Sequence, residues 1–386
     1  MMTMTRTEES TAVAITSGPT LLLAFELGER IWKLGFTTGL GQRPRVRQIP
    51  ARATDRVLEE IARAKVRFHL PPDAAVVSCY EAGREAFWLH RWLVAHGVRN
   101  HVIDSSSIAV SRRARRSKTD RLDLEGLLNL LARFQNGEHR AWRIVRVPTV
   151  VEEDARHLHR TREALQQDRT RIINRLKGLL TTQGLALRLD AHFRTQLDTT
   201  RLWDGTPIPA GLHARLQRTW AQLEFLNRTL ADVDSERAAP VPTLPTTLSR
   251  YVTSLPTLRG IGPIGAWTLA TEIFGWREIK NRRQLGGLVG LVPAPYQSGD
   301  STHDQGITRA GNKHVRRLMV QLAWSWIRYQ PDSALTQWYQ RKFGRGSRRL
   351  RRIGIVALAR RLLIALWRYV EHGECPDGAM VKGQAA

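Results

Sequence analysis

The feature that most constrains the fold is a long charged stretch in the middle of the chain. Residues 151–189 are rich in Arg, Leu, Glu and Gln and contain no glycine before Gly178. This composition predicts one long amphipathic helix, and residues 210–237 predict a second, with Pro207 and Pro209 breaking the chain between them. Two such helices predict an antiparallel hairpin or a coiled-coil dimer arm. Ordinary helices packed on a neighbouring domain are the alternative.

The segment before these helices alternates short apolar runs with amphipathic stretches. Residues 20–36 predict two strands joined by a tight turn at Gly28-Glu29. Further strands are predicted at 74–80 and 100–104, and helices at 53–66, 84–96 and 119–134, the last with Thr119 as its N-cap. Strands alternating with helices predict an α/β sheet domain over residues 18–148.

The segment after the long helices is predicted to be a mostly helical domain over residues 247–375. A proline-containing linker, AAPVPTLPTT, precedes it, and GIGPIG at 260–265 marks a bend. Glycines there allow backbone N–H groups to approach a phosphate, as in helix-hairpin-helix proteins, or allow a turn that needs positive φ. The predicted fold class is therefore α/β plus α, with a disordered leader at 1–17, a helical segment at 149–246 and a tail at 376–386.

The charge balance indicates a polyanionic partner. The chain has 60 Lys and Arg against 35 Asp and Glu, a net charge of +25, and nucleic acid is the usual partner of such a protein. The excess clusters in three tracts, RRARRSK at 112–118, Arg316-Arg317 and RGSRRLRRIG at 345–354. No apolar run of about 18 residues predicts a membrane span, and two cysteines cannot form a disulfide framework or a zinc site. A cytoplasmic protein is expected.

Four carboxylates stand where a two-metal nuclease would place its ligands. Glu26 lies in the first predicted strand, Glu81 follows the strand at 74–80, and Asp120 and Asp123 lie three apart at a helix start. Phosphodiester displacement uses two Mg²⁺ ions, which prefer carboxylate oxygens. Helix dipoles also favour acids at such positions, so this alternative stays open. The rival carboxylates are Glu29, Glu85, Asp104 and Glu125.

Basic residues next to Asp120 either neutralise these acids or hold a DNA phosphate over the metals. They are Arg112, Arg113, Arg115, Arg116 and Lys118.

Several motifs together resemble the DEDD transposases of the insertion-sequence family called IS-one-ten. They are the strand bearing Glu26, YEAG at 80–83 and KTDRLD at 118–123. The C-terminal half agrees in order, with LRGIGPIGAWTLATEIF at 258–274, LGGLVGLVPAPYQSG at 285–299 and GITRAGNKHVRRLMVQLAW at 306–324. The resemblance covers residues from about 20 to about 370.

The resemblance implies an N-terminal RNase H-like (RuvC-like) domain that holds two Mg²⁺ ions on Glu26, Glu81, Asp120 and Asp123. It implies that Ser298, in YQSG, attacks DNA and forms a covalent phosphoserine link, with Ser301 as a nearby rival. It further implies coiled-coil dimers that pair into a tetramer, and a bridge RNA that base-pairs with donor and target DNA. Glu26 departs from the family pattern, which usually has aspartate there.

A serine hydroxyl needs activation to act as a nucleophile, and no histidine triad is evident around Ser298. The carboxylate–metal site would therefore have to activate the serine. The serine and the carboxylates could meet within one chain or across subunits. From the residues alone, Ser298 lies in a Gly-rich polar loop. Arg309, Lys313, Arg316 and Arg317 are expected to contact nucleic-acid backbone. The leading hypothesis is a transposase. The alternatives are a RuvC-like structure-specific endonuclease that uses water and a non-catalytic nucleic-acid-binding scaffold.

Overall fold

The computed structural model describes residues 18–83, 85–108, 120–238, 244–298 and 301–383. The chain divides into two compact units, Met1–Val147 and Pro148–Ala386. The predicted leader, the basic residues of 112–118 and the predicted cap Thr119 lie outside the described residues. Within the described ranges, no helix is long and apolar enough to cross a membrane.

The N-terminal unit is built on a five-stranded mixed sheet with the order β3-β2-β1-β4-β5. β1 is antiparallel to β2 and parallel to β4, and β4 is parallel to β5. The strands are β1 (Thr20–Leu27), β2 (Ile31–Thr37), β3 (Arg45–Pro50), β4 (Ala75–Glu81) and β5 (Arg99–Ile103). The predicted strands are confirmed. β3 was not predicted from the sequence; its RVRQIP segment carries the charged residues that protect an exposed sheet edge.

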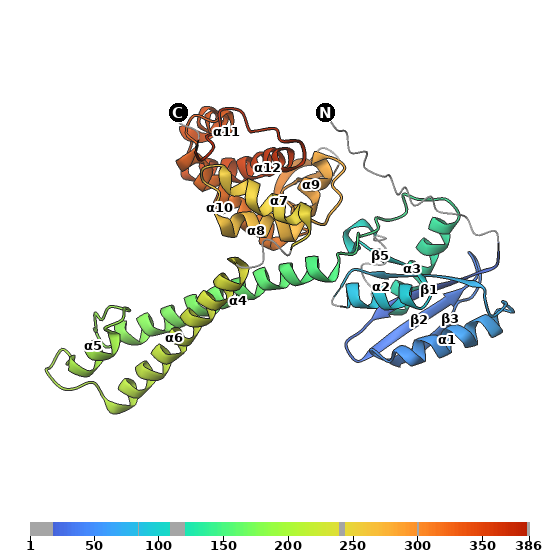
Figure 1. Cartoon of the computed structure of the whole chain (residues 1–386), viewed down its shortest axis with the longest axis horizontal. Helices are drawn as coiled ribbons and strands as arrows, with labels where there is room; N and C mark the ends of the chain where they lie inside the picture. Colours follow the sequence, from blue (N-terminus) through green and yellow to red (C-terminus); the bar gives the residue numbers. More distant parts are fainter. Residues whose placement is uncertain (1–17, 84, 109–119, 239–243, 299–300, 384–386) are drawn as a thin grey trace. The chain divides into compact units, whose positions relative to one another are not determined.

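Helices cover both faces of this sheet (Figure 1). α1 (Thr54–Arg67) and α2 (Ala86–Ala95) pack on one face, and α3 (Asp120–Gln135) packs on the other. A short 3-10 turn, η1 (Ser105–Ser107), follows β5. Along β1 the side chains alternate as the pleat requires, so that Leu23 and Phe25 face α1 and α2 while Ala24 faces α3. All three predicted helices are present within a few residues of their expected bounds.

The C-terminal unit begins with two long helices, α4 (Val150–Thr181) and α6 (Ala210–Ala238). They form an antiparallel hairpin with the short α5 (Phe193–Thr199) near its far end (Figure 1). Arg162 pairs with Asp234 at 2.7 Å, and further along Arg169 donates to Asn227 at 2.6 Å. The hairpin has its own apolar core, in which Phe193 stacks on Trp220 with ring centroids 4.5 Å apart. The first half of α4 instead packs on the rest of the unit through Ala155.

Local sequence signals set the two ends of α4. At the start, Thr149 and Glu152 form a capping box, each side chain accepting from the other's backbone N–H. The helix ends at Thr181 rather than at residue 189, because Gly184 adopts a φ of +67° and Leu185 N–H donates back to the Leu180 carbonyl at 3.0 Å. A glycine in the left-handed conformation is a common helix stop.

The remainder of the C-terminal unit is a helical body around one apolar core that contains Trp267, Trp326 and Leu362. Its helices are α7 (Thr246–Ser254), η4 (Leu255–Thr257), α8 (Pro263–Leu269), the π-helix η5 (Ala270–Phe274), α9 (Arg282–Val289), α10 (Lys313–Tyr329), α11 (Ala334–Tyr339), the π-helix η6 (Gln340–Gly344) and α12 (Arg348–His372).

The GIGPIG bend joins η4 to α8 and requires glycine at its first position. Gly260 has a φ of +89°, and a Cβ there would lie 3.4 Å from both the Ser325 carbonyl oxygen and Tyr329 Cβ. Ser325 Oγ donates to the Gly260 carbonyl at 2.8 Å. These contacts support the tight-bend interpretation of the motif.

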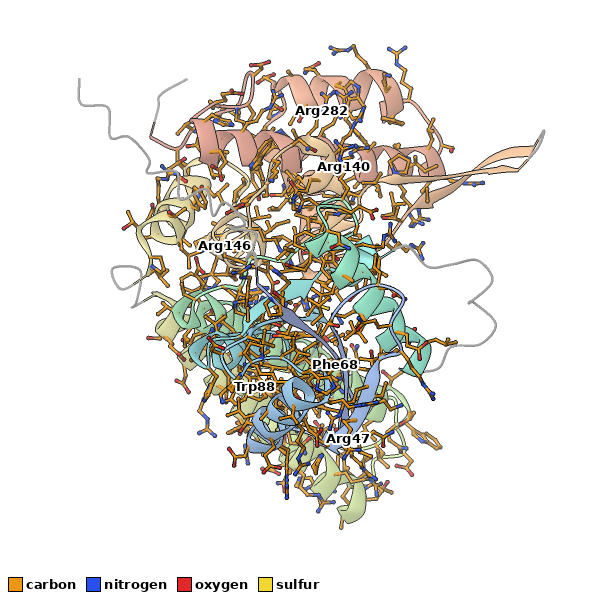
Figure 2. The ribbon with its side chains drawn as sticks, turned by 90° about the vertical axis from the view of Figure 1, so that its right-hand side faces the viewer. Arg47, Phe68, Trp88, Arg140, Arg146 and Arg282 are labelled. Carbon is orange, nitrogen blue, oxygen red and sulfur yellow. The ribbon has the colours of Figure 1, made fainter. Side chains whose placement is uncertain are left out.

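The body also contains a two-stranded antiparallel hairpin that sequence analysis did not predict. β6 (Pro293–Ser298) pairs with β7 (Ser301–Ile307), and Figure 2 shows this ribbon reaching out from the helices. Pro293 and Pro295 lack the N–H that a ladder uses, so they make a strand assignment unfavourable from sequence. The ladder accommodates them with a register shift between these two prolines.

Candidate functional site

The sheet brings Glu26 and Glu81 to the same end of two neighbouring strands. The last registered pair of the parallel β1–β4 ladder is Phe25 with Tyr80, and the two glutamates are the next residues of their strands. Glu26 is half-buried and Glu81 is exposed. Lys33, on β2, lies directly opposite Glu26 in the antiparallel register.

Strand alternation directs both glutamates to the face that α3 covers. Ala24 and Cys79, two positions before Glu26 and Glu81, are both buried in the α3-side core. The Cys79 thiol donates to the Leu127 carbonyl of α3 at 3.8 Å, so this helix lies over β4. Burial first, and the nearby Glu81 charge second, raise the pKa of the Cys79 thiol.

The other two predicted carboxylates lie in the first turn of α3. Asp123 precedes the sheet-facing Leu127 by four residues, and Asp120 precedes the sheet-facing Leu124 by four. Residues four apart share a helix face, so this spacing directs Asp123 toward the sheet. The Asp120 side chain lies outside the described part of the structure. Among the side chains that are described, no three of the His, Cys, Asp and Glu residues form a group that could hold a metal ion.

Two of the rival carboxylates have other surroundings. Glu85 is 5% exposed, forms an ion pair with Arg52 and accepts a hydrogen bond from Trp88 Nε1 at 2.6 Å. Asp104 directly follows β5, where Ile103 lies in the α3-side core, so alternation directs Asp104 to the opposite face from Glu26 and Glu81.

The candidate nucleophile lies in the other unit, at the end of a strand rather than in a loop. Ser298 is the last residue of β6, and Ser301, the rival serine, is its register partner on β7. The two serines therefore stand opposite each other at the tip of the hairpin. Residues 299–300 between them lie outside the described residues, as do the side chains of both serines.

The four basic residues after this hairpin have different environments. The Arg316 guanidinium donates to the carbonyls of Val289 and Ala310 at 2.9 and 3.0 Å, which ties the loop before α10 to α9. Arg317 forms an ion pair with Glu163 of α4. Arg309 and Lys313 are exposed, and Arg309 adopts a left-handed φ of +55°.

A buried polar network joins α4, η5 and the start of α10. Glu272 is 1% exposed and accepts two hydrogen bonds from Arg160, at 2.8 and 3.1 Å, and one from Asn312 Nδ2 at 2.7 Å. Asn312 also caps α10 directly after the β6–β7 hairpin. This network was not predicted from the sequence, where its one signal is a glutamate inside the apolar run LATEIF.

Burial shifts the pKa of each titratable group described in this network, and at Glu272 its partners reverse the direction. Burial raises the pKa of Glu272, but the hydrogen bonds and positive charge of Arg160, together with Asn312, outweigh it and leave the pKa below its usual value. Burial lowers the pKa of His159 to about 4. His159 Nδ1 lies 3.2 Å from Thr268 Oγ1, and its Nε2 is buried with no hydrogen-bond partner among the described residues. Burial also lowers the pKa of His314, which contacts Glu163.

Comparison with known proteins places the whole chain in one family. A putative transposase of Sinorhizobium fredii, y4rJ, is 38% identical over 396 residues, which cover 98% of each chain. A sequence model described as the IS116/IS110/IS902 transposase family matches residues 252–340. The chain belongs to the IS116/IS110/IS902 family of transposases.

More distant relatives match about half of the chain. The transposase for insertion sequence element IS1111A of Coxiella burnetii is 27% identical over 55% of this chain and 56% of its own. The transposase for IS1328 of Yersinia enterocolitica is 27% identical over 56% of this chain and 62% of its own. The transposase family predicted from the motifs is thus confirmed, whereas the carboxylate, serine and bridge-RNA features that the resemblance implies stay predictions. The segment matched by the family model contains Glu272, Ser298 and Asn312.

Proposed function

We propose that this protein is an insertion-sequence transposase that cuts and rejoins DNA through a serine nucleophile and a Mg²⁺-binding carboxylate site. The observation that carries the proposal is the 38% identity to a putative transposase over 98% of both chains. The similarity extends over both the N-terminal and the C-terminal unit, so we expect both units to take part in one reaction.

The proposed metal ligands are Glu26, Glu81, Asp120 and Asp123, in a RuvC-like N-terminal unit. Support comes from the adjacent ends of β1 and β4 and from the spacing of the aspartates in α3. Carboxylate oxygens are the donors that Mg²⁺ prefers, so these residues fit the ion. When bound, two such ions stabilise charge on the attacking and leaving oxygens of an in-line displacement.

In the proposed reaction, Ser298 Oγ forms a bond to a DNA phosphorus as the bond from that phosphorus to one strand oxygen breaks. The serine proton leaves to a base, and the released strand end takes up a proton as its hydroxyl forms. A strand hydroxyl then attacks the phosphoserine, restores a phosphodiester and releases the serine. One phosphoester bond replaces another at each step, so no external energy source is required.

Glu26 is the member of the set that departs from the family pattern. Its side chain is one methylene longer than aspartate, and Lys33 stands opposite it in the sheet register. The longer side chain, at a half-buried position on the α3-covered face, still offers the carboxylate oxygens that Mg²⁺ prefers. We propose that Glu26 is a functional ligand with altered metal geometry.

The proposed partners are donor and target DNA and a bridge RNA, and the net charge of +25 suits all of them. The expected place of action is the cytoplasmic nucleoid. We propose that the α4–α6 hairpin also serves as a dimer arm, with dimers pairing into a tetramer. Support comes from Phe225 on α6, which is 60% exposed beside Ile172 and Leu226 in a surface hollow.

A covalent-adduct assay tests the chemistry. End-labelled element-junction DNA, the flanking element RNA and Mg²⁺ are incubated with the full chain, and protein-linked label is measured after denaturation. We expect an adduct that disappears in Ser298→Ala and persists in Ser301→Ala, the matched control at the register partner. We also expect Asp123→Asn to abolish it.

The other outcomes separate the alternative functions. Cleavage that survives in Ser298→Ala would contradict the serine mechanism and favour a RuvC-like nuclease that uses water. Binding without any Mg²⁺-dependent cleavage would favour a non-catalytic scaffold. Recombination that proceeds equally well without the RNA would contradict the bridge-RNA proposal alone.

A further inference from the structure

A groove runs along α12 in the C-terminal unit, and the reaction proposed above does not use it. Its larger part is a cavity of about 980 Å³ at the base of the β6–β7 hairpin, where Pro293, Gly306 and Ile307 line it. A smaller hollow of about 540 Å³ shares Ile353 and Val356 with this cavity. Both are lined by α12, on which the stretch from residue 348 to residue 368 spans about 30 Å at about 1.5 Å per residue.

Arginines from separate elements line this groove. Arg348, Arg349 and Arg352 belong to the RGSRRLRRIG tract and line the small hollow. The large cavity receives Arg360, Arg361 and Arg368 from α12, Arg309 from the loop before α10, and two arginines from α9, Arg282 (Figure 2) and Arg283.

Only two acidic side chains lie among the described residues that line the groove, Glu374 and Asp377. The ion pair between Arg368 and Glu374 is long, at 3.9 Å. The groove is therefore strongly positive, which favours an anionic ligand with several charges.

Arg360, in the wall of this groove, has a donor atom without a partner among the described residues. Its Nε atom is buried and has no hydrogen-bond partner in the described part of the structure. A Cβ on Gly286 of α9 would lie 3.4 Å from this Nε, so the absence of a side chain there makes room for the guanidinium. Buried donors in native proteins are normally satisfied, so we expect the Arg360 guanidinium to shift and take an acceptor when an anion occupies the groove.

The walls between the arginines are apolar. Leu335, Trp338 and Ile364 line the large cavity, and the Arg361 guanidinium lies over the Trp338 ring at 4.0 Å. Sites that bind single-stranded nucleic acid typically place positive charge along the sugar-phosphate backbone and apolar or aromatic surface against the faces of the bases. In a duplex the base faces are stacked on each other and cannot reach such walls.

We propose that this groove binds a single strand of nucleic acid, with phosphates on the arginines and unpaired bases against the apolar wall. The binding itself does not depend on the proposed chemistry. One point rests on the proposed function: that the bound strand is the one cut and rejoined at the adjacent β6–β7 hairpin. DNA and RNA share the recognised chemistry, and the experiment distinguishes them.

A native cysteine of the chain can report whether this groove is occupied. Of its two cysteines, Cys79 is buried and Cys375 is exposed and lines the large cavity. Alkylation of the intact protein is therefore expected to modify Cys375 and to leave Cys79 unmodified. We expect a bound single-stranded oligonucleotide to slow alkylation of Cys375, as measured by mass spectrometry in the Ser298→Ala protein without Mg²⁺, where no cleavage occurs.

Matched variants locate the effect. Arg282→Gln with Arg283→Gln removes two exposed guanidiniums from the groove, whereas Arg259→Gln with Arg328→Gln removes two exposed ones outside it. Each phosphate contact contributes about 0.7 to the salt slope of single-strand binding. The groove variant is thus expected to reduce that slope by about 1.4, to bind about 25-fold more weakly at 0.1 M salt, and to lose protection of Cys375. The control variant should retain affinity and protection.

Oligonucleotides of one sequence are compared as single-stranded DNA, single-stranded RNA and duplex. Stronger protection by either single strand than by the duplex supports the proposal and identifies the strand type. Equal or better protection by the duplex would overturn the single-strand assignment. Tight binding without protection of Cys375, or equal weakening in the two arginine variants, would overturn the site. Because no cleavage is measured, neither result bears on whether Ser298 is the nucleophile.

Discussion

Replacing Glu272 with glutamine is expected to loosen the attachment of α4 to the helical body. The amide keeps the shape of the carboxylate but removes its charge, and its NH₂ group must face a donor of either Arg160 or Asn312. Breaking a buried ion pair from one side costs about 3–5 kcal/mol. The Arg160 side chain is 44% exposed, so solvent screening reduces the expected loss to about 2–3 kcal/mol.

Amide hydrogen exchange measures this loss where it occurs. Residues 155–163 lie in the half of α4 that contacts the body, whereas residues 172–180 contribute to the separate core of the hairpin. A loss of about 2–3 kcal/mol in local opening corresponds to exchange roughly 30- to 150-fold faster in the first segment. The second segment should be unchanged. Glu138→Gln, which removes a surface ion pair with Arg133, serves as the control and should change neither.

Exchange of residues 155–163 within threefold of the wild type would refute the claim that Glu272 holds α4. Equal acceleration in both segments would also refute it, because the effect would then be global. Adding Arg160→Met to Glu272→Gln should recover part of the loss, since the second change removes the donor that the first one leaves unpaired.

Three further predictions concern the core, acid stability and the candidate metal site. Gly35→Ala should destabilise the N-terminal unit by about 1–3 kcal/mol in urea unfolding, because its new Cβ would lie 2.8 Å from Leu128 Cδ1. Its control is Gly126→Ala in α3, where a new Cβ would have no neighbouring atom within 4 Å; this change should stabilise the unit by up to about 1 kcal/mol. Folding lowers the pKa of His159 from about 6.5 to about 4, so the free energy of unfolding falls by about 1.4 kcal/mol per pH unit as the pH drops from 6.5 toward 4. Urea titrations at pH 6.5 and pH 5 should show this loss in the wild type and a smaller loss in His159→Leu. An equal loss of unfolding free energy in both proteins would contradict the assignment to His159. Glu26→Gln should slow Mg²⁺-dependent adduct formation by about 100-fold or more while Glu26→Asp retains it, and full activity in Glu26→Gln would remove Glu26 from the ligand set.

Local sequence patterns determined much of the protein. Residue spacing predicted β1, β2, β4, β5 and the helices between them, because burial of one face repeats with a period of two or about 3.6 residues. The same reasoning predicted α4 and α6, and the ordered motifs predicted the transposase family. Positive charge, which depends only on composition, indicated nucleic acid as the partner.

Tertiary structure decided which of these residues meet. The β1–β4 register, not any local signal, brings Glu26 beside Glu81, whose positions are 55 residues apart in the sequence. Glu272 meets Arg160 across 112 residues, and the arginines of α9 and α12 form one groove only when both helices pack on the same core. Ser298 changed from an expected loop residue to a strand end because pairing with β7 outweighs the two prolines of β6. Periodicity records which face of an element is buried, but not which distant element buries it, and long-range pairing therefore required the structure.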